Sequence, residues 1–272
     1  MTTSKTEIFT DLQIEHDGDA LIIRFLRPEV RNAIRSHTWR ELESALDIAE
    51  SDPSVRVAVI TGGPEFFCAG ADLQENASAD PQILADQFYM TMRLRQAQRF
   101  LDRLRLFPKP SVAAVEGFAI GLGWCIALSC DMIVASETTY FAQPAAAAGM
   151  LMDGGLLRQL IEALGVRRTT EIMLTRTTLS SSEAYGYGMV NRLTETGKAL
   201  EGAGELVVEI SRRPASVHFV NKALLASALN GDRESFYEHE STAVALNRIQ
   251  PANVLGRQQF LAGKRFYSDS ST

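Results

Sequence analysis

The sequence predicts an α/β domain followed by a region made only of helices. Two patterns predict this division. Along residues 1–195, short apolar and β-branched runs alternate with glycine turns and with apolar residues at helical spacing, which is typical of an α/β domain with stacked ββα turns. Along residues 196–272 the spacing is helical and strand signals are absent. We therefore expect a core domain over residues 1–195 and a carboxy-terminal helical region over residues 196–272.

The amino-terminal elements are predicted by alternation and by turn residues. Residues 12–15 alternate between apolar and polar, residues 17–19 are a turn signal, and residues 20–25 return as the second strand of a hairpin. Apolar residues at helical spacing predict a helix over residues 39–49. A β-branched run over residues 55–61, closed by a Gly-Gly-Pro turn, predicts a buried strand.

The middle of the core domain continues with a long helix, several strands and a glycine turn. Apolar residues at helical spacing predict a helix from Pro81 to Leu106, which Pro108 and Pro110 end. Strands are expected over 111–115, 132–135 and 139–141, with a glycine-punctuated turn over 117–123 and the first turns of a helix over 124–129.

After about residue 155 the pattern becomes helical. Gly165 separates two helical stretches, and Ser180-Ser181-Ser182-Glu183 is a capping box that starts another helix. Residues 188–190 end that helix and lead into a short strand. The remaining helices are expected over 156–164, 167–174, 196–212, 214–229, 234–248 and 251–262.

The composition limits the classes of function. The 272 residues carry 27 basic and 33 acidic side chains, with a net charge of −6, and an acidic surface repels phosphate backbones and anionic lipid. We therefore expect neither a nucleic-acid nor a membrane partner. Apolar runs are shorter than the roughly 18 residues of a membrane span, and the amino-terminal residues lack a signal-peptide core. Three cysteines without metal-ligand spacing and four scattered histidines indicate a reducing, cytoplasmic compartment and no metal site.

Two glycine-containing turns each follow a predicted buried strand. Residues 66–73 are mainly small, which lets a ligand approach free main-chain N–H groups. Residues 116–123 open a helix, whose first N–H groups are unpaired and lie at the positive end of the helix dipole. Each turn alone is most simply a tight connection. Two N–H groups aimed at one point would form an oxyanion hole, in which each donor contributes roughly 3–4 kcal/mol to an enolate-like transition state.

Four segments occur in a distinctive order and spacing. They are Arg27-Pro28-Glu29-Val30-Arg31-Asn32-Ala33, residues 59–73 (VITGGPEFFCAGADL), residues 109–123 (KPSVAAVEGFAIGLG) and Cys130-Asp131. Together they closely resemble the enoyl-CoA hydratase/isomerase (crotonase) superfamily, over about residues 12–265. The resemblance implies a crotonase-like spiral of ββα turns with a helical trimerisation region, assembled as a homotrimer or a dimer of trimers. It also implies an acyl-CoA thioester substrate, with coenzyme A as part of the substrate and no separate cofactor.

The resemblance also implies roles for particular residues. The N–H groups of Ala71 and Leu122 would hold the thioester oxygen. Trp124, just after the second turn, either shapes the acyl pocket or packs in the core. The other substrate-binding residues that the resemblance implies are Ala69, Gly70, Asp72, Leu73 and Gly121 in the two turns, Arg31 beside the coenzyme A, and Phe260 and Lys264 in the last helix and just after it.

Two positions depart from the hydratase pattern. Hydration of a conjugated thioester needs a water held between two carboxyl groups, one acting as base and the other delivering a proton to carbon. In the hydratases that this chain resembles, both groups are glutamates. Here Cys125 and Ala145 stand at those positions. Neither can transfer protons in that way, so the sequence disfavours simple hydration.

One acidic residue lies in the segment Gly149-Met150-Leu151-Met152-Asp153-Gly154-Gly155, which resembles the Pro-Asp-Gly-Gly segment of isomerase-like members. A lone carboxylate suits a double-bond shift, because it can remove a proton from one carbon and return it two carbons away while the oxyanion hole holds the dienolate. Residues 145–152 are largely apolar, so burial should raise the pKa of Asp153. The alternative is that Asp153 only caps the following helix, since aspartate is a favoured N-cap residue.

Other charged or reactive residues have simpler interpretations. Glu116 is expected to make a structural hydrogen bond, and Cys125 to be a buried, inert thiol. The small residues 145–148 leave room for an acyl chain. Five arginines form one basic helix face, which is either a solvated or subunit-contact surface or attracts coenzyme A phosphates: Arg93, Arg95, Arg99, Arg103 and Arg105.

Three functions therefore stay open. The first is an enoyl-CoA isomerase that uses Asp153 as its base. The second is a divergent hydratase or lyase of the same fold that acts on an unusual acyl group. The third is an acyl-CoA-binding protein without catalysis, which the residues Cys125 and Ala145 keep in consideration.

Overall fold

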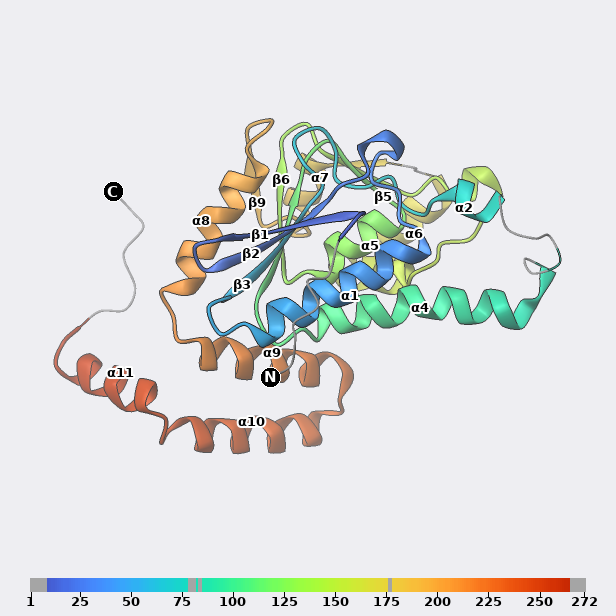
Figure 1. The fold of residues 1–272 in the computed structure, drawn as a ribbon. Helices are drawn as coiled ribbons and strands as arrows, with labels where there is room; N and C mark the ends of the chain where they lie inside the picture. The colour runs from blue at the N-terminus through green and yellow to red at the C-terminus, as the bar shows by residue number, and fades with distance from the viewer. Residues whose placement is uncertain (1–8, 78–81, 83–84, 176–177, 265–272) are drawn as a thin grey trace, which may run out of the picture. The chain divides into compact units, whose positions relative to one another are not determined.

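The computed structural model describes residues 9–77, 82, 85–175 and 178–264 (Figure 1). The chain divides into two compact units, Met1–Arg212 and Arg213–Thr272. In the first unit a large sheet has the strand order β1-β2-β3-β4-β6-β9, in which β1 and β2 are antiparallel and the other neighbours are parallel. Its strands are β1 (Leu12–Asp17), β2 (Ala20–Phe25), β3 (Val57–Thr61), β4 (Ser111–Val115), β6 (Met132–Ser136) and β9 (Arg192–Thr194).

A second sheet consists of three short strands in the order β5-β7-β8, where β7 pairs with β5 in parallel and with β8 antiparallel. The strands are β5 (Phe118–Ile120), β7 (Tyr140–Ala142) and β8 (Thr178–Ser180). The sequence predicts a turn throughout residues 117–123, so β5 is a correction. Three residues between glycines carry too weak a pattern to indicate a strand, and β5 forms because β7 lies beside it.

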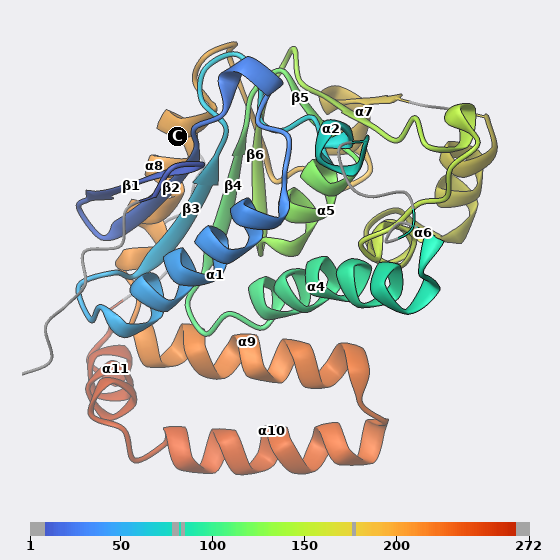
Figure 2. The ribbon, with the colours of Figure 1, turned by 45° about the vertical axis from the view of Figure 1, so that its right-hand side comes forward.

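The large sheet is covered on both faces. Every residue of β3 is buried, which explains its apolar run Val57–Ile60, because a strand covered on both faces does not alternate. Leu21 and Ile23 belong to one core, with the helices α1 (Ser36–Ser51), α4 (Gln87–Arg105) and α5 (Leu122–Ser129), which lie on the same side of the sheet (Figure 2). Ile22 and Val59 face the other core, with α8 (Ala199–Ser211). This arrangement of strands and helices confirms the α/β class.

Helix α8 lies on the sheet through Ala199, Ala203, Leu206 and Val207, all of which are buried. It therefore belongs to the first unit. The sequence predicts a domain boundary before this helix, at residues 195/196, whereas the two units of the structure meet after it, at Arg212 and Arg213. The shift arises because one face of α8 is apolar enough to cover the sheet.

The predicted helix boundaries are largely confirmed. Helix α4 begins at Gln87, where the Asp86 side chain accepts hydrogen bonds from two first-turn amides, and the predicted start at Pro81 lies outside the described residues. Gly165 breaks the helical dihedrals inside α6 (Leu156–Thr175), with φ of 75° and ψ of 164°. The capping box at Ser180 opens α7 (Ser181–Gly186). Shorter segments are η1 (Pro28–Val30), α2 (Leu73–Ala77) and η2 (Ala146–Ala148).

The second unit contains the helices α9 (Ala215–Asn230), α10 (Arg233–Asn247) and α11 (Pro251–Leu261). The Ser227 hydroxyl and His239 Nδ1 lie 2.9 Å apart and link α9 to α10. None of the residues in these three helices is buried. Among the helices that the structure describes, none combines the length and apolar character of a membrane span.

Candidate active site

The first glycine-containing turn is tied to the segment before α1 by two main-chain hydrogen bonds. The Ile34 amide donates to the Gly70 carbonyl oxygen (2.7 Å), and the Asp72 amide donates to the Ile34 carbonyl oxygen (2.8 Å). This is the pattern of a parallel bridge between Ile34 and Ala71. Because the groups on both sides of Ala71 point toward Ile34, the N–H of Ala71 itself points to the opposite side.

The second turn ends at Gly121, which is the N-cap of α5 with a φ of 52°. Such a positive φ favours glycine. Leu122 is the first residue of this helix, so its N–H has no partner inside the helix. In the described part of the chain, neither the Leu122 amide nor the Ala71 amide donates a hydrogen bond.

The two turns lie against each other. The amides of Phe67 and Cys68 donate to the Phe118 carbonyl oxygen (3.1 and 3.2 Å), and the Ile120 amide donates to the Cys68 carbonyl oxygen (2.9 Å). A Cβ atom on Gly70 would lie 2.7 Å from the Ile120 oxygen and 3.5 Å from the Leu122 nitrogen. Only glycine therefore fits at residue 70, and the close packing brings the neighbouring Ala71 and Leu122 amides near each other.

One cavity of about 80 Å³ is bordered by Ala71, Leu122 and Asp153. Residues of α1, α2 and α4 and of the segments that precede α1, α2 and α6 form its remaining walls. Helices α1 and α4 lie side by side in the first unit (Figure 2). The structure thus brings the two expected oxyanion donors and the expected base to the same cavity. Two donors without acceptors and a carboxylate at one cavity can stabilise a developing oxyanion and move a proton beside it.

Asp153 lies in the loop before α6; the residue is exposed, and it borders the cavity. Its carbonyl oxygen accepts a hydrogen bond from the Leu156 amide (3.1 Å). Among the described residues, however, its side chain accepts none from the first turn of the helix, so the N-cap geometry is not formed. Burial raises the pKa of the Asp153 carboxyl above its ordinary value, because a low-polarity environment disfavours the charged form.

The two positions that hold glutamates in hydratases carry no acid here. Cys125 is fully buried in α5, and its Sγ atom lies 3.8 Å from the Asp153 carbonyl oxygen. Burial raises the pKa of the Cys125 thiol, and the nearby Asp153 charge raises it further. Cys125 is therefore a buried thiol, as expected, and both effects favour its protonated form. Ala145 is also buried. Among the described residues that line the cavity, Asp153 is therefore the one carboxyl without an ion-pair partner.

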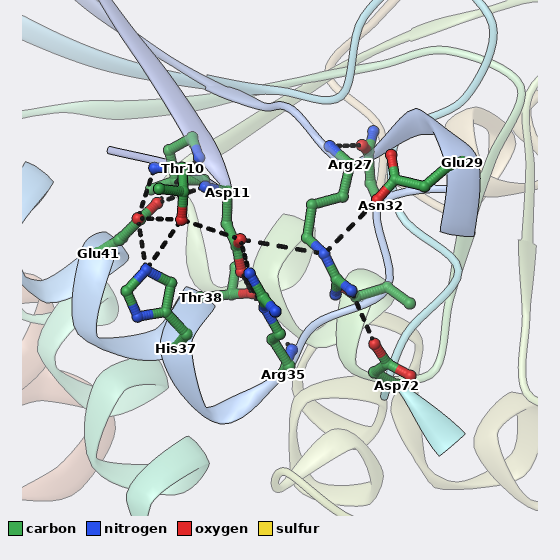
Figure 3. A network of polar contacts seen from close by, with 12 residues as sticks. Thr10, Asp11, Arg27, Glu29, Asn32, Arg35, His37, Thr38, Glu41 and Asp72 are labelled. Atoms are coloured by element: carbon green, nitrogen blue, oxygen red, sulfur yellow. Dashed lines mark hydrogen bonds and ion pairs between the residues drawn. The ribbon is translucent and has the colours of Figure 1, made fainter. Parts of the chain in front are cut away.

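A network of ion pairs supports the first turn (Figure 3). Arg27 Nη2 lies 3.0 Å from Asp72 Oδ2, and both side chains are buried or nearly so. Asp72 Oδ1 accepts the amide of Gln74 (3.0 Å). Burial alone would raise the pKa of Asp72, but the hydrogen bonds from Arg27 and from the amides outweigh it and the pKa is lowered. Asp72 is therefore an ionised anchor beside Ala71.

Asp11, His37 and Glu41 place oxygen and nitrogen atoms within 4.8 Å of one another, a spacing that could suit a cation (Figure 3). Protein donors already occupy these atoms. Glu41 accepts the amides of Asp11 (2.8 Å) and Leu12 (2.9 Å), and His37 Nε2 lies 2.8 Å from Glu41 Oε1. Asp11 accepts Arg35 Nε (2.8 Å). The group is therefore a hydrogen-bonded support for the start of α1.

Several predicted substrate-binding residues lie elsewhere. Trp124 is fully buried and packs on Phe141, with ring centroids 5.6 Å apart, so its assignment to the substrate is corrected to the core. It points inward because α5 is buried on almost all sides. Gly121 contributes to the second turn through its positive φ. Residues 146–148 are exposed, and the expectation that the small residues 145–148 leave room for an acyl chain stays a prediction.

The residues expected along the coenzyme A path are at the surface or in the first turn. Arg31 is exposed, and its carbonyl oxygen accepts the Ala69 amide (2.9 Å). Leu73 is exposed as well. Phe260 and Lys264 are exposed in the second unit, so their expected contact with coenzyme A stays a prediction. As expected, Glu116 makes a structural hydrogen bond: its Oε1 accepts the Ala199 amide at the start of α8 (2.8 Å).

The remaining walls of the cavity are not foreseen from the sequence. Arg35 and Trp39 come from the start of α1, and Glu75 comes from α2. The α4 wall consists of Met90, Arg93, Leu94, Gln96 and Ala97. Met90, Arg93, Leu94 and Ala97 follow the i, i+3, i+4, i+7 spacing of one helix face. This spacing could have indicated that the face is partly buried, but not that it borders a cavity.

Comparison with known proteins places the chain among acyl-CoA enzymes. A family model described as enoyl-CoA hydratase/isomerase matches residues 15–257. The 2,3-dehydroadipyl-CoA hydratase of Escherichia coli is 31% identical over 219 residues, which cover 80% of this chain and 83% of that protein. The mevalonyl-coenzyme A hydratase of Aspergillus fumigatus is 35% identical over 205 residues, covering 75% and 74%. The crystal structure of an enoyl-CoA hydratase from Polaromonas matches with a TM-score of 0.86 and 27% identity, covering 93% and 97%.

Proposed function

Because the chain belongs to the enoyl-CoA hydratase/isomerase family, we propose that it shifts the double bond of an enoyl-CoA thioester, with Asp153 as the base. The observation that carries this proposal is that Asp153 borders the same cavity as Ala71 and Leu122. The two amides have no other acceptor in the described chain. They are the donors that an enolate oxygen needs.

The proposed reaction moves one proton between two carbons. The Asp153 carboxylate takes a proton from C2 of a 3-enoyl thioester, and the released electron pair forms the C1–C2 double bond of a dienolate. The negative charge moves to the thioester oxygen, between the N–H groups of Ala71 and Leu122. Protonated Asp153 then delivers the proton to C4. The double bond forms between C2 and C3, the thioester carbonyl is restored, and Asp153 is again ionised.

The electrostatics of the cavity favour Asp153 as the base. Asp72 and Glu75 also border the cavity, but Asp72 pairs with Arg27 and Glu75 pairs with Arg93 at 2.5 Å. Both are held by a cation and serve poorly as proton acceptors. Asp153 has no such partner among the described residues, and its pKa is raised by burial. A carboxylate of raised pKa accepts a carbon-bound proton more readily.

A second candidate is hydration of an unusual enoyl group, which the names of the relatives favour: the Escherichia coli and Aspergillus fumigatus proteins are called hydratases. Hydration would need a second acid or base, and Cys125 and Ala145 do not provide one. Incubation with 2-enoyl thioesters and with 3-enoyl thioesters, followed by mass spectrometry, separates the two candidates. Isomerisation leaves the mass unchanged, whereas hydration adds the mass of one water.

The proposal is tested by the substitution Asp153→Asn. Loss of a general base costs roughly 10²–10⁴ in rate, so we expect turnover of a 3-enoyl-CoA, followed by ultraviolet absorbance of the conjugated product, to fall by about that factor. Asp102→Asn, on the exposed side of α4, is the matched control and should keep full activity. Full turnover by Asp153→Asn would rule out Asp153 as the base. Tight acyl-CoA binding without turnover by the unmodified protein would favour a binding role.

We also propose that the chain assembles as a homotrimer or a dimer of trimers through its second unit. Helices α9 to α11 contain no buried residue, and so much exposed apolar surface typically marks an interface. Large apolar side chains on or beside these helices that are more than half exposed include Phe219, Leu225, Leu229, Tyr237, Leu246, Ile249, Phe260 and Leu261. Sedimentation equilibrium should give three or six times the chain mass of 29.9 kDa. A monomer at micromolar concentration would contradict this assembly.

A further inference from the structure

The α4 wall of the cavity contains more polar groups than an acyl chain requires. Helix α4 presents Met90, Arg93, Leu94, Gln96 and Ala97 to the cavity. Three of these are apolar, as a hydrocarbon chain requires. Arg93 and Gln96 are hydrogen-bonding groups and only partly exposed, and neither is needed by the proposed proton transfer.

Both side chains have hydrogen-bond donors without an acceptor among the described residues. The Arg93 side chain is 20% exposed and, in the described chain, donates only from Nη2, to Glu75 (2.5 Å). A guanidinium carries five N–H donors, so most of them remain available. Gln96 makes no hydrogen bond within the described residues, although its amide offers two donors and an acceptor.

A plain alkyl chain in this cavity would remove water from Arg93 and Gln96 without offering either side chain a hydrogen-bond acceptor. Burying polar groups without a hydrogen-bond partner is costly. An acyl group that carries an oxygen would instead accept hydrogen bonds from both residues. A site built to hydrogen-bond a substrate group discriminates strongly against the analogue that lacks it.

The position of these residues along α4 places the oxygen away from the reacting carbons. The Leu101 side chain lies against Gly154, next to Asp153: a Cβ atom on Gly154 would be 3.3 Å from Leu101 Cδ1. Ala97 precedes Leu101 by one helical turn and Arg93 precedes it by two, which corresponds to roughly 6–12 Å along the helix axis at about 1.5 Å per residue. The polar wall therefore lies toward the far end of a medium-length acyl chain.

We infer that the cavity selects acyl-CoA thioesters whose acyl group carries a hydrogen-bond-accepting oxygen near its far end, read by Arg93 and Gln96. This rests on the proposed acyl-CoA function. The shared chemistry is an oxygen acceptor, which a hydroxyl or a carboxylate can supply. Glu75 balances the charge of Arg93, so the wall does not require an anion.

The test measures binding of three saturated, unreactive thioesters of equal length by calorimetry: octanoyl-CoA, ω-hydroxyoctanoyl-CoA and suberoyl-CoA. Saturated chains separate recognition from turnover. We expect at least one oxygenated ligand to bind about tenfold or more tightly than octanoyl-CoA, the difference made by one hydrogen bond to a charged group. The tighter of the two oxygenated ligands shows whether the site prefers a hydroxyl or a carboxylate.

Two variants assign the preference to the α4 wall. Arg93→Met and Gln96→Leu should each reduce the preference toward unity, in part by strengthening octanoyl-CoA binding, because the alkyl chain then no longer removes water from a polar group. Gln96→Leu keeps the Arg93–Glu75 ion pair, so it decides the result if Arg93→Met fails to fold by circular dichroism. Arg95→Met, at an exposed position of the same helix outside the cavity lining, is the control and should keep the preference.

Octanoyl-CoA binding as tightly as the oxygenated ligands would overturn the inference and leave the proposed function intact. The inference also fails if Gln96→Leu and Arg93→Met weaken all three ligands equally, or if Arg95→Met removes the preference as fully as they do. Failure of all three thioesters to bind would overturn the acyl-CoA function and this inference together.

Discussion

Substitution of Leu122 by proline would remove one oxyanion donor without removing the helix that carries it. Leu122 is the first residue of α5, the position where proline is best tolerated, because its missing N–H has no helical partner. The preceding Gly121 has a ψ of −114°, outside the α region that proline disfavours in its predecessor. The proline ring would replace the N–H that faces the cavity.

The expected effect on rate follows from the loss of one donor to a developing oxyanion. Such a loss costs about 3–4 kcal/mol of transition-state stabilisation, or roughly 10²–10³ in kcat. The substitution also removes a buried side chain, since Leu122 is only 7% exposed, and a buried leucine truncation costs about 2–5 kcal/mol of stability. Leu122→Ala loses the same side chain and keeps the N–H, so it is the matched control.

The assay compares kcat of Leu122→Pro and Leu122→Ala on a 3-enoyl-CoA, at a temperature at which both variants are folded by circular dichroism. We expect the alanine variant to be within about tenfold of the unmodified protein and the proline variant to be lower again by roughly 10²–10³. Equal kcat values for the two variants would show that the Leu122 amide does not hold the thioester oxygen.

Other consequences of the site can be measured on the same protein. Because burial raises the pKa of Asp153, kcat/KM should fall as the pH drops through that raised pKa. Burial also penalises the ionised group, so Asp153→Asn should raise the unfolding free energy in urea at neutral pH, and the gain should vanish below the ordinary aspartate pKa. Asp72→Asn removes the 3.0 Å ion pair of the Arg27 guanidinium and leaves it Asp11 and Glu29 at 4.0 Å, so it should cost about 1.5–3 kcal/mol in the same urea assay, the contribution of a hydrogen bond between charged groups. Iodoacetamide should leave the activity unchanged, because Cys125 is buried and its pKa is raised. An unchanged pH profile, an unaltered urea midpoint, or rapid inactivation would contradict the respective expectation.

The sequence predicts the strands and helices that local pattern determines. The β-branched run of β3 and the capping box at Ser180 are confirmed because each is encoded within a few residues. Strand β5 is not predicted, since three residues form a strand only when β7 and the first turn lie beside them. The place of α8 on the sheet likewise depends on which surface its apolar stripe meets.

The functional site, like the fold, is predicted only in part from the sequence. Ala71, Leu122 and Asp153 can be named from motifs and resemblance, and the structure brings them to one cavity. The sequence leaves Trp124 either in the acyl pocket or in the core, and the buried surroundings of α5 direct it into the core. Arg93 and Gln96 have no such signal, because an exposed arginine-rich face and a cavity wall have the same spacing in sequence.

The central claim is that one thioester oxygen lies between the Ala71 and Leu122 amides while Asp153 reaches the acyl carbons. A crystal structure of the protein with a bound, unreactive acyl-CoA tests it most directly. We expect both amide nitrogens at about 2.7–3.1 Å from the thioester oxygen, with an Asp153 carboxylate oxygen beside C2 and C4. An acyl-CoA bound with its thioester oxygen outside the two turns, or with Asp153 turned away from the chain, would contradict it.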